Sequence, residues 1–152
     1  MRRLVGLLAV VLAGCSTGDG LEPLEVRLET PDERTTLDID GCGRDDDIIV
    51  LGASSASVLV QLLLVLEGDD VDLEASAVTV TLADRGALGA GDADAIQAGA
   101  PPGTITSARV RGDRIDVVAA ARPVTVGSDL EPGELRLTAR CTADEDLAAT
   151  PP

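Results

Sequence analysis

Apolar and polar residues alternate with a period of two along most of this chain, which is the pattern of β-strands with one buried face. The alternation is clear over residues 24–29 and 37–40, and again over residues 135–141. Gly, Pro and Asp residues separate such segments, as turns require. The pattern predicts an all-β domain, built as an antiparallel sandwich or partial barrel of about seven to eight strands.

One segment is almost continuously apolar. Residues 58–66 contain only one polar side chain, that of Gln61. Such a run fits either a buried strand or a helix segment. Its length and its place before the Gly68-Asp69-Asp70 turn favour a central strand covered on both faces.

The pattern changes twice after this run. Apolar side chains occupy odd positions over residues 71–77 and even positions over residues 78–82. A shift of one residue within a strand predicts a β-bulge or bend near Ala77. Residues 83–103 are rich in Ala and Gly and end in Pro101-Pro102-Gly103, so we expect a long loop there.

Residues 106–119 predict a hairpin. Gly112-Asp113 provides a two-residue turn, with Gly at the position that a type II′ turn requires. In the expected register Arg109 faces Asp116 across the polar side. The residues expected to face the core are Thr106, Ala108, Val110, Ile115, Val117 and Ala119.

The first fifteen residues follow a different pattern. Arg2-Arg3 precedes an apolar run over residues 4–12, and the small pair Ala13-Gly14 precedes Cys15. This stretch resembles a bacterial lipoprotein signal, in which a peptidase cuts before the cysteine and its thiol carries a diacylglycerol. A transmembrane anchor or buried core helix is the alternative, but a spanning helix needs about 20 apolar residues. Two acyl chains suffice for stable anchoring.

This interpretation divides the chain into four parts. Residues 1–14 form a signal peptide, and residues 15–21 form the lipidated N-terminus and a short tether. Residues 22–143 form the β-domain, and residues 144–152 form an acidic, disordered tail. The expected location is the bacterial cell envelope, outside the cytoplasm and anchored to a membrane by lipid.

The chain has three cysteines. If Cys15 is lipidated, Cys42 and Cys141 remain as an even pair in an exported chain, where oxidation is favoured. We therefore expect one disulfide, with two free buried thiols as the alternative. The bridge would close a loop of about 100 residues and contribute roughly 4–5 kcal/mol in the chain-entropy model.

The charge of the chain is strongly negative. It is −15 for the full sequence, and removing Arg2 and Arg3 with the signal lowers it to −17. This charge argues against nucleic acid as a partner. It also argues against adhesion to anionic lipid headgroups beyond the acyl anchor. A monomeric domain held just off a membrane is the expectation.

Several residue types are missing altogether: the sequence has no Phe, Tyr, Trp, His, Lys or Asn. Without His, the usual general base and the commonest zinc ligand are absent. Without Lys, Schiff-base chemistry is excluded. Without aromatic residues, no platform can stack on sugars or bases. We therefore expect a protein that is not an enzyme and has no catalytic residues, metal or cofactor.

Three remaining motifs each have a purely structural explanation as well as a functional one. Arg111-Gly112-Asp113 spells the integrin-recognition tripeptide, but Gly-Asp is also ordinary turn chemistry. Ser54 and Ser55 lack a His or Lys base. Aspartates that could offer oxygen ligands to Ca²⁺ lack the EF-hand spacing, so solvated acidic loops are expected. These aspartates are Asp38, Asp40, Asp45, Asp46, Asp47, Asp92 and Asp94.

Four features together resemble a known family. They are the lipobox at residues 12–15, Asp40-Gly41-Cys42, the hairpin around Gly112-Asp113, and residues 134–141 ending in Cys141. In this layout the chain is similar to the LpqH family, the mycobacterial 19 kDa lipoprotein antigens. The resemblance implies a surface antigen whose acylated N-terminus engages innate immune lipoprotein receptors. The chain departs from the family in its short tether and extreme acidity.

The sequence predicts a non-catalytic, lipid-anchored envelope lipoprotein that exposes an acidic β-domain for surface or structural interaction. The alternative is a carrier or binding protein for a small apolar ligand, with residues 58–66 as a pocket wall. A filled core would favour the first function, and an apolar cavity of several hundred cubic ångströms would favour the second.

Overall fold

Strands dominate the structure, a computed structural model that describes residues 25–30 and 34–141. The expected signal peptide, Cys15, the tether and the acidic tail lie outside the described residues. In chain order, the elements are β1 (Glu25–Glu29), β2 (Arg34–Arg44), β3 (Ile48–Ser54), β4 (Val58–Glu67), β5 (Asp70–Leu82), β6 (Gly86–Gly91), α1 (Ala93–Ile96), β7 (Thr104–Arg111), β8 (Arg114–Pro123) and β9 (Gly133–Arg140).

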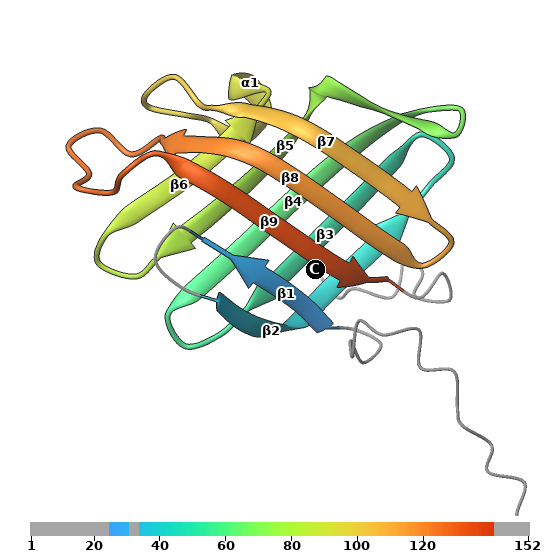
Figure 1. The fold of residues 1–152 in the computed structure, drawn as a ribbon, viewed down its shortest axis with the longest axis horizontal. Helices are drawn as coiled ribbons and strands as arrows, with labels where there is room; N and C mark the ends of the chain where they lie inside the picture. The colour runs from blue at the N-terminus through green and yellow to red at the C-terminus, as the bar shows by residue number, and fades with distance from the viewer. Residues whose placement is uncertain (1–24, 31–33, 142–152) are drawn as a thin grey trace, which may run out of the picture.

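The nine described strands form one sheet in the order β6-β5-β4-β3-β2-β1-β9-β8-β7. The sheet curls until β6 also pairs with the end of β8, where Leu88 lies opposite Pro123 and Gly89 opposite Arg122. In Figure 1, β1 and β7–β9 form a front layer whose strands cross those of β2–β6 behind. The predicted all-β partial barrel is therefore confirmed.

Aliphatic side chains from both layers fill the space between them. From β4, Val60 and Leu64 are fully buried, and from β8, Ile115 and Val117 are 1% exposed. These residues belong to one continuous hydrophobic cluster. Since the sequence has no aromatic residues, the core consists of Leu, Val, Ile, Ala and the two cysteines.

Strand β4 is covered on one face, not on both as its apolar run predicted. Its residues alternate between buried and more exposed positions; Leu59 is 40% exposed and Gln61 is also exposed. The prediction was wrong because a run of apolar residues is typical of parallel sheets covered by helices on both faces. This sheet is antiparallel, and α1 is the single helix among the described residues.

The predicted irregularity near Ala77 is a bulge in β5. Leu63 pairs with Ala77 and Val65 with Asp72, so the intervening residues of β5 lie outside the regular register. Ser76 is fully buried there. Its hydroxyl donates to the Asp72 carbonyl at 2.6 Å and accepts from the Val65 N–H at 2.9 Å. The hydroxyl thus replaces pairing that the bulge removes.

The segment 83–103 contains β6 and α1, so the expected long loop was wrong. Its small residues allow backbones to meet where the sheet closes. The N–H of Gly91 (φ +102°) donates to the Gly103 carbonyl at 3.0 Å, and an added Cβ at Gly91 would lie 2.0 Å from the Ser76 carbonyl oxygen. Because β6 consists mostly of Ala and Gly, its sequence shows no alternation of apolar and polar residues, and the strand could not be predicted from it.

The β7–β8 hairpin has the expected turn. Arg111 pairs with Arg114 around it, and φ is positive at Gly112 (+59°) but not at Asp113, as in a type II′ turn. Thr106 was expected to face the core but is exposed, and Ile105 is buried instead. A register shift between residues 105 and 107 causes this exchange. The other expected core positions are buried or half-buried.

Candidate functional site

The two cysteines of the β-domain form the predicted disulfide. Cys42 in β2 and Cys141, immediately after β9, are joined with their Cα atoms 5.9 Å apart and a sequence separation of 99. Cys42 is 7% exposed and Cys141 is 8% exposed. Because β2 and β9 are separated by β1 in the sheet, the bridge ties two strands that do not pair directly.

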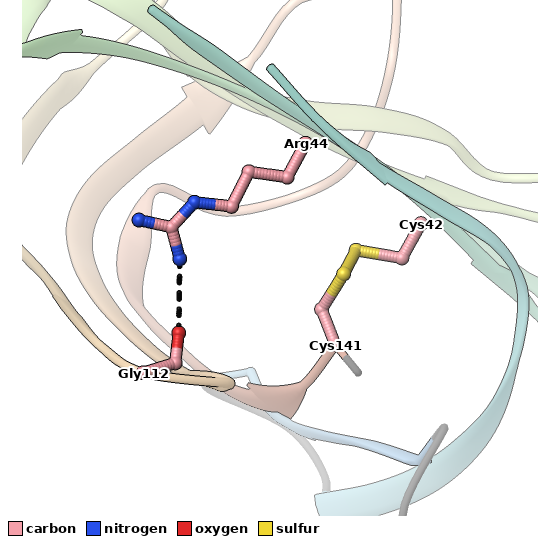
Figure 2. Close-up of a disulfide and its surroundings, with 4 residues drawn as sticks. All are labelled: Cys42, Arg44, Gly112 and Cys141. Carbon is pink, nitrogen blue, oxygen red and sulfur yellow. Dashed lines mark hydrogen bonds between the residues drawn. A yellow bond between two sulfur atoms is a disulfide. The ribbon is translucent and has the colours of Figure 1, made fainter. Parts of the chain in front are cut away.

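The tip of the β7–β8 hairpin lies beside this disulfide. Figure 2 shows Arg44 and Cys42 pointing from the same strand toward Gly112 and Cys141. A guanidinium nitrogen of Arg44 donates to the Gly112 carbonyl at 3.0 Å. The two side chains share a direction because they are two residues apart in a strand.

Asp113 completes what we call the hairpin–disulfide junction, made of Cys42, Arg44, Gly112, Asp113, Arg140 and Cys141. The Asp113 carboxylate forms an ion pair with Arg140 at 3.0 Å. The Asp113 carbonyl accepts a 2.7 Å hydrogen bond from the Cys141 N–H. Arg140 and Cys141 therefore both hold the hairpin tip in place through Asp113.

The junction gives Arg111-Gly112-Asp113 a structural role. Gly112 supplies the positive φ of the turn and Asp113 contacts β9, with its side chain only 35% exposed. The carboxylate that an integrin would have to engage is thus already paired within the chain. This geometry supports the turn explanation of the tripeptide.

The partner of Asp116 differs from the expected one. Arg109 lies opposite Asp116, as predicted, but the ion pair joins Asp116 to Arg114 at 2.9 Å. Thr138 from β9 also donates to the same carboxylate at 3.1 Å. Along the strand, Arg114 is two residues away on the same face, which sequence alternation alone could have suggested.

The aspartates considered as calcium ligands act locally where the structure gives them a partner. The Asp45 carboxylate accepts from the Asp46 N–H at 2.8 Å. The Asp92 carboxylate caps α1 by accepting from the Asp94 N–H at 3.0 Å. Within residues 25–30 and 34–141, no three His, Cys, Asp or Glu side chains converge as a metal site would require.

The serines considered as nucleophiles also have simple environments. Ser54 ends β3, and the Ser55 hydroxyl accepts from the Ser57 N–H at 3.4 Å in the following turn. The sequence contains no His or Lys to activate either hydroxyl. Nothing in this arrangement supports nucleophilic catalysis.

A groove of about 490 Å³ lies along the front layer, where β7, β8 and the loop before β9 meet. Its lining includes Pro102, Thr104, Ala120, Arg122 and Glu134. No residue of β4 lines this groove. The inward side chains of β4, which were the expected pocket wall, instead belong to the filled core.

Of the junction residues, sequence reasoning identified the cysteines and the turn but missed Arg44 and Arg140. Their positions close to the cysteines in sequence could have singled them out, since Arg44 is two residues after Cys42 and Arg140 directly precedes Cys141. No described helix is long and apolar enough to cross a membrane. No protein family matches the chain, and no curated protein matches it either.

Proposed function

We propose that this protein is a non-catalytic lipoprotein of the bacterial cell envelope. In this proposal Cys15 carries a diacylglycerol and acyl chains, and the acidic β-domain is exposed outside the cytoplasm for surface or structural interaction. The domain is monomeric, binds no nucleic acid and requires no cofactor.

One observation carries the proposal: the disulfide between Cys42 and Cys141. Disulfides persist in oxidising compartments, so the bridge supports export of the chain. The bridge also uses two of the three cysteines in the sequence. The third, Cys15, stands behind an apolar run and Ala13-Gly14, which is where a lipoprotein signal requires it.

The layout of the bridge supports a surface role of the LpqH kind. It joins an early cysteine, Cys42, to one that follows the last strand, Cys141. That arrangement is the one implied by the resemblance to the LpqH family. We extend the proposal accordingly to an acylated surface antigen.

Replacing Cys15 tests the anchor. The experiment compares Cys15→Ser with the double variant Cys42→Ser/Cys141→Ser in a bacterium that processes lipoproteins, using labelled palmitate and membrane fractionation. Cys15→Ser should lose the label and leave the membrane fraction, whereas the double variant should keep the label. A Cys15→Ser chain that is still labelled would refute the proposal.

A carrier of a small apolar ligand is the second candidate. It is favoured by the 490 Å³ groove, a volume within the usual range of ligand pockets. Ala120 is exposed in the groove, so Ala120→Leu should fill it. If an apolar dye binds the wild-type protein and Ala120→Leu abolishes that binding, the carrier gains support; equal binding would dismiss it.

A further inference from the structure

Charge is distributed unevenly between the two layers of the barrel. Residues 34–103, which form the back layer and α1, contain three arginines and thirteen acidic residues. Residues 25–30 and 104–141, which form β1, β7–β9 and their loops, contain seven arginines and seven acidic residues. The strongly negative net charge therefore belongs mainly to one side of the molecule.

Three arginines stand side by side across the front layer. Arg111 of β7 lies opposite Arg114 of β8, and Arg114 lies opposite Arg140 of β9. Neighbouring strands are about 4.8 Å apart, and like charges directly opposite one another are unfavourable. Arg109, two residues before Arg111 on β7, extends the group, which we call the arginine cluster.

The cluster keeps an excess of positive charge after its internal pairs are considered. Asp116 pairs with Arg114, and Asp113 pairs with Arg140. Arg109 and Arg111 are exposed and form no ion pair with any described residue. Two guanidinium groups are thus available to an external anion, and guanidinium matches phosphate with two parallel hydrogen bonds.

The cluster lies at the end of the barrel where the chain enters from Cys15. Val26 of β1 pairs with Ala139 of β9, so the start of β1 is beside Arg140, and Figure 1 shows the start of β1 and the end of β9 at the same end of the front layer. Ten residues, 16–25, follow Cys15 up to and including the first residue of β1. Fully extended, they span at most about 35 Å.

We propose that the arginine cluster contacts the phosphates of anionic lipid headgroups in the membrane that holds Cys15. This inference rests on the proposed lipid anchor and adds an orientation to it: the end of the front layer that carries the arginine cluster faces the membrane, and the other end of β8, which carries Arg122, faces away. Net repulsion does not prevent the contact, because exposed charges beyond the Debye length of about 8 Å are largely screened.

Chemical modification of arginine in the anchored protein tests this orientation. The acylated chain is placed in neutral phosphatidylcholine vesicles or in vesicles with one third phosphatidylglycerol, and phenylglyoxal modification of each arginine is followed by mass spectrometry. Arg122 is the internal control, since it is exposed, unpaired among the described residues and at the other end of β8.

Anionic vesicles should slow modification of Arg109 and Arg111 about fivefold relative to neutral vesicles, given the usual attraction per cation near such a surface. Arg122 should react equally in both. The slowing should vanish in 1 M salt, where the Debye length is about 3 Å. The variant Arg109→Gln/Arg111→Gln should lose the slowing at Arg114 and Arg140, whereas Arg122→Gln should leave slowing at Arg109 and Arg111 unchanged.

Other outcomes overturn the inference in separate ways. If the chain floats with neutral vesicles but its arginines react equally in both lipids, the orientation is wrong and the anchor stands. Equal slowing at Arg122 would also refute the specific contact. If millimolar inorganic phosphate slows Arg109 and Arg111 in neutral vesicles as strongly, the cluster is a site for free phosphate. A chain that does not float at all refutes the anchor and the inference together.

Discussion

Arg44 donates a 3.0 Å hydrogen bond to the carbonyl of Gly112 and so joins β2 to the tip of the β7–β8 hairpin. The contact lies beside the disulfide, where the two layers of the barrel meet at one end. Several stabilising interactions converge at this point, and they differ greatly in strength. Their separate removal gives a direct test of what holds the barrel together.

The disulfide should dominate the stability of the junction. Cys42→Ala/Cys141→Ala removes a crosslink between residues 99 apart and should lower the free energy of unfolding by about 4–5 kcal/mol. Arg44→Ala removes an exposed hydrogen bond and should cost less than about 1 kcal/mol. Urea denaturation followed by far-ultraviolet circular dichroism suits a chain without aromatic residues. Equal losses in the two variants would contradict this ranking.

The hydroxyl of Ser76 should matter far more than an exposed one. Ser76→Ala leaves the Val65 N–H and the Asp72 carbonyl without their partner inside the bulge, which should cost about 1–3 kcal/mol. Ser107→Ala is the matched control, because Ser107 is exposed on β7. Urea denaturation measures both variants. If their midpoints are equal, the bulge does not depend on the Ser76 hydroxyl.

The pairing of β6 with β5 beside the bulge should depend on glycine at position 91. Gly91→Ala forces a side chain into a left-handed backbone and against the Ser76 carbonyl, so we expect a loss of about 2 kcal/mol or more. At Gly41, an added Cβ meets nothing within 4 Å, and Gly41→Ala should be close to neutral. Thermal unfolding compares the two, and a melting temperature unchanged in Gly91→Ala would rule out the close approach of Gly91 to the Ser76 carbonyl.

Calcium should leave the protein unaffected. The Asp45 and Asp92 carboxylates bond to nearby backbone N–H groups, and no described acidic group converges on one point. A specific site would raise stability by about 2.7 kcal/mol at one hundred times its dissociation constant. A calcium titration followed by thermal unfolding checks this, and a rising melting temperature with saturation would reveal a site that the geometry does not predict.

Alternation of apolar residues predicted the strands that carry large side chains but failed where small residues form the strand. Leu135 and Leu137 mark β9 in the sequence and are buried as expected. Strand β6, in contrast, consists of Ala, Leu and Gly, and its pairing depends on contacts with β5, β8 and Gly103. Contacts between segments distant in sequence do not appear in a local pattern.

Net charge does not show where the charges lie on the surface. The total charge argues against adhesion to anionic headgroups, but it treats every carboxylate as equally near to every arginine. The register of β7, β8 and β9 instead gathers Arg111, Arg114 and Arg140 in one row. Pairing of the cysteines was easier to predict, because setting Cys15 aside as an expected lipidation site leaves Cys42 and Cys141 as one pair.

The intact mass of the protein extracted from membranes tests the lipid anchor most directly. The account predicts a chain that begins at Cys15, carries the added mass of a diacylglycerol and acyl chain, and is two hydrogens lighter because of the Cys42–Cys141 bridge. A membrane-bound chain that still begins at Met1, or one that begins at Cys15 without added mass, would contradict it.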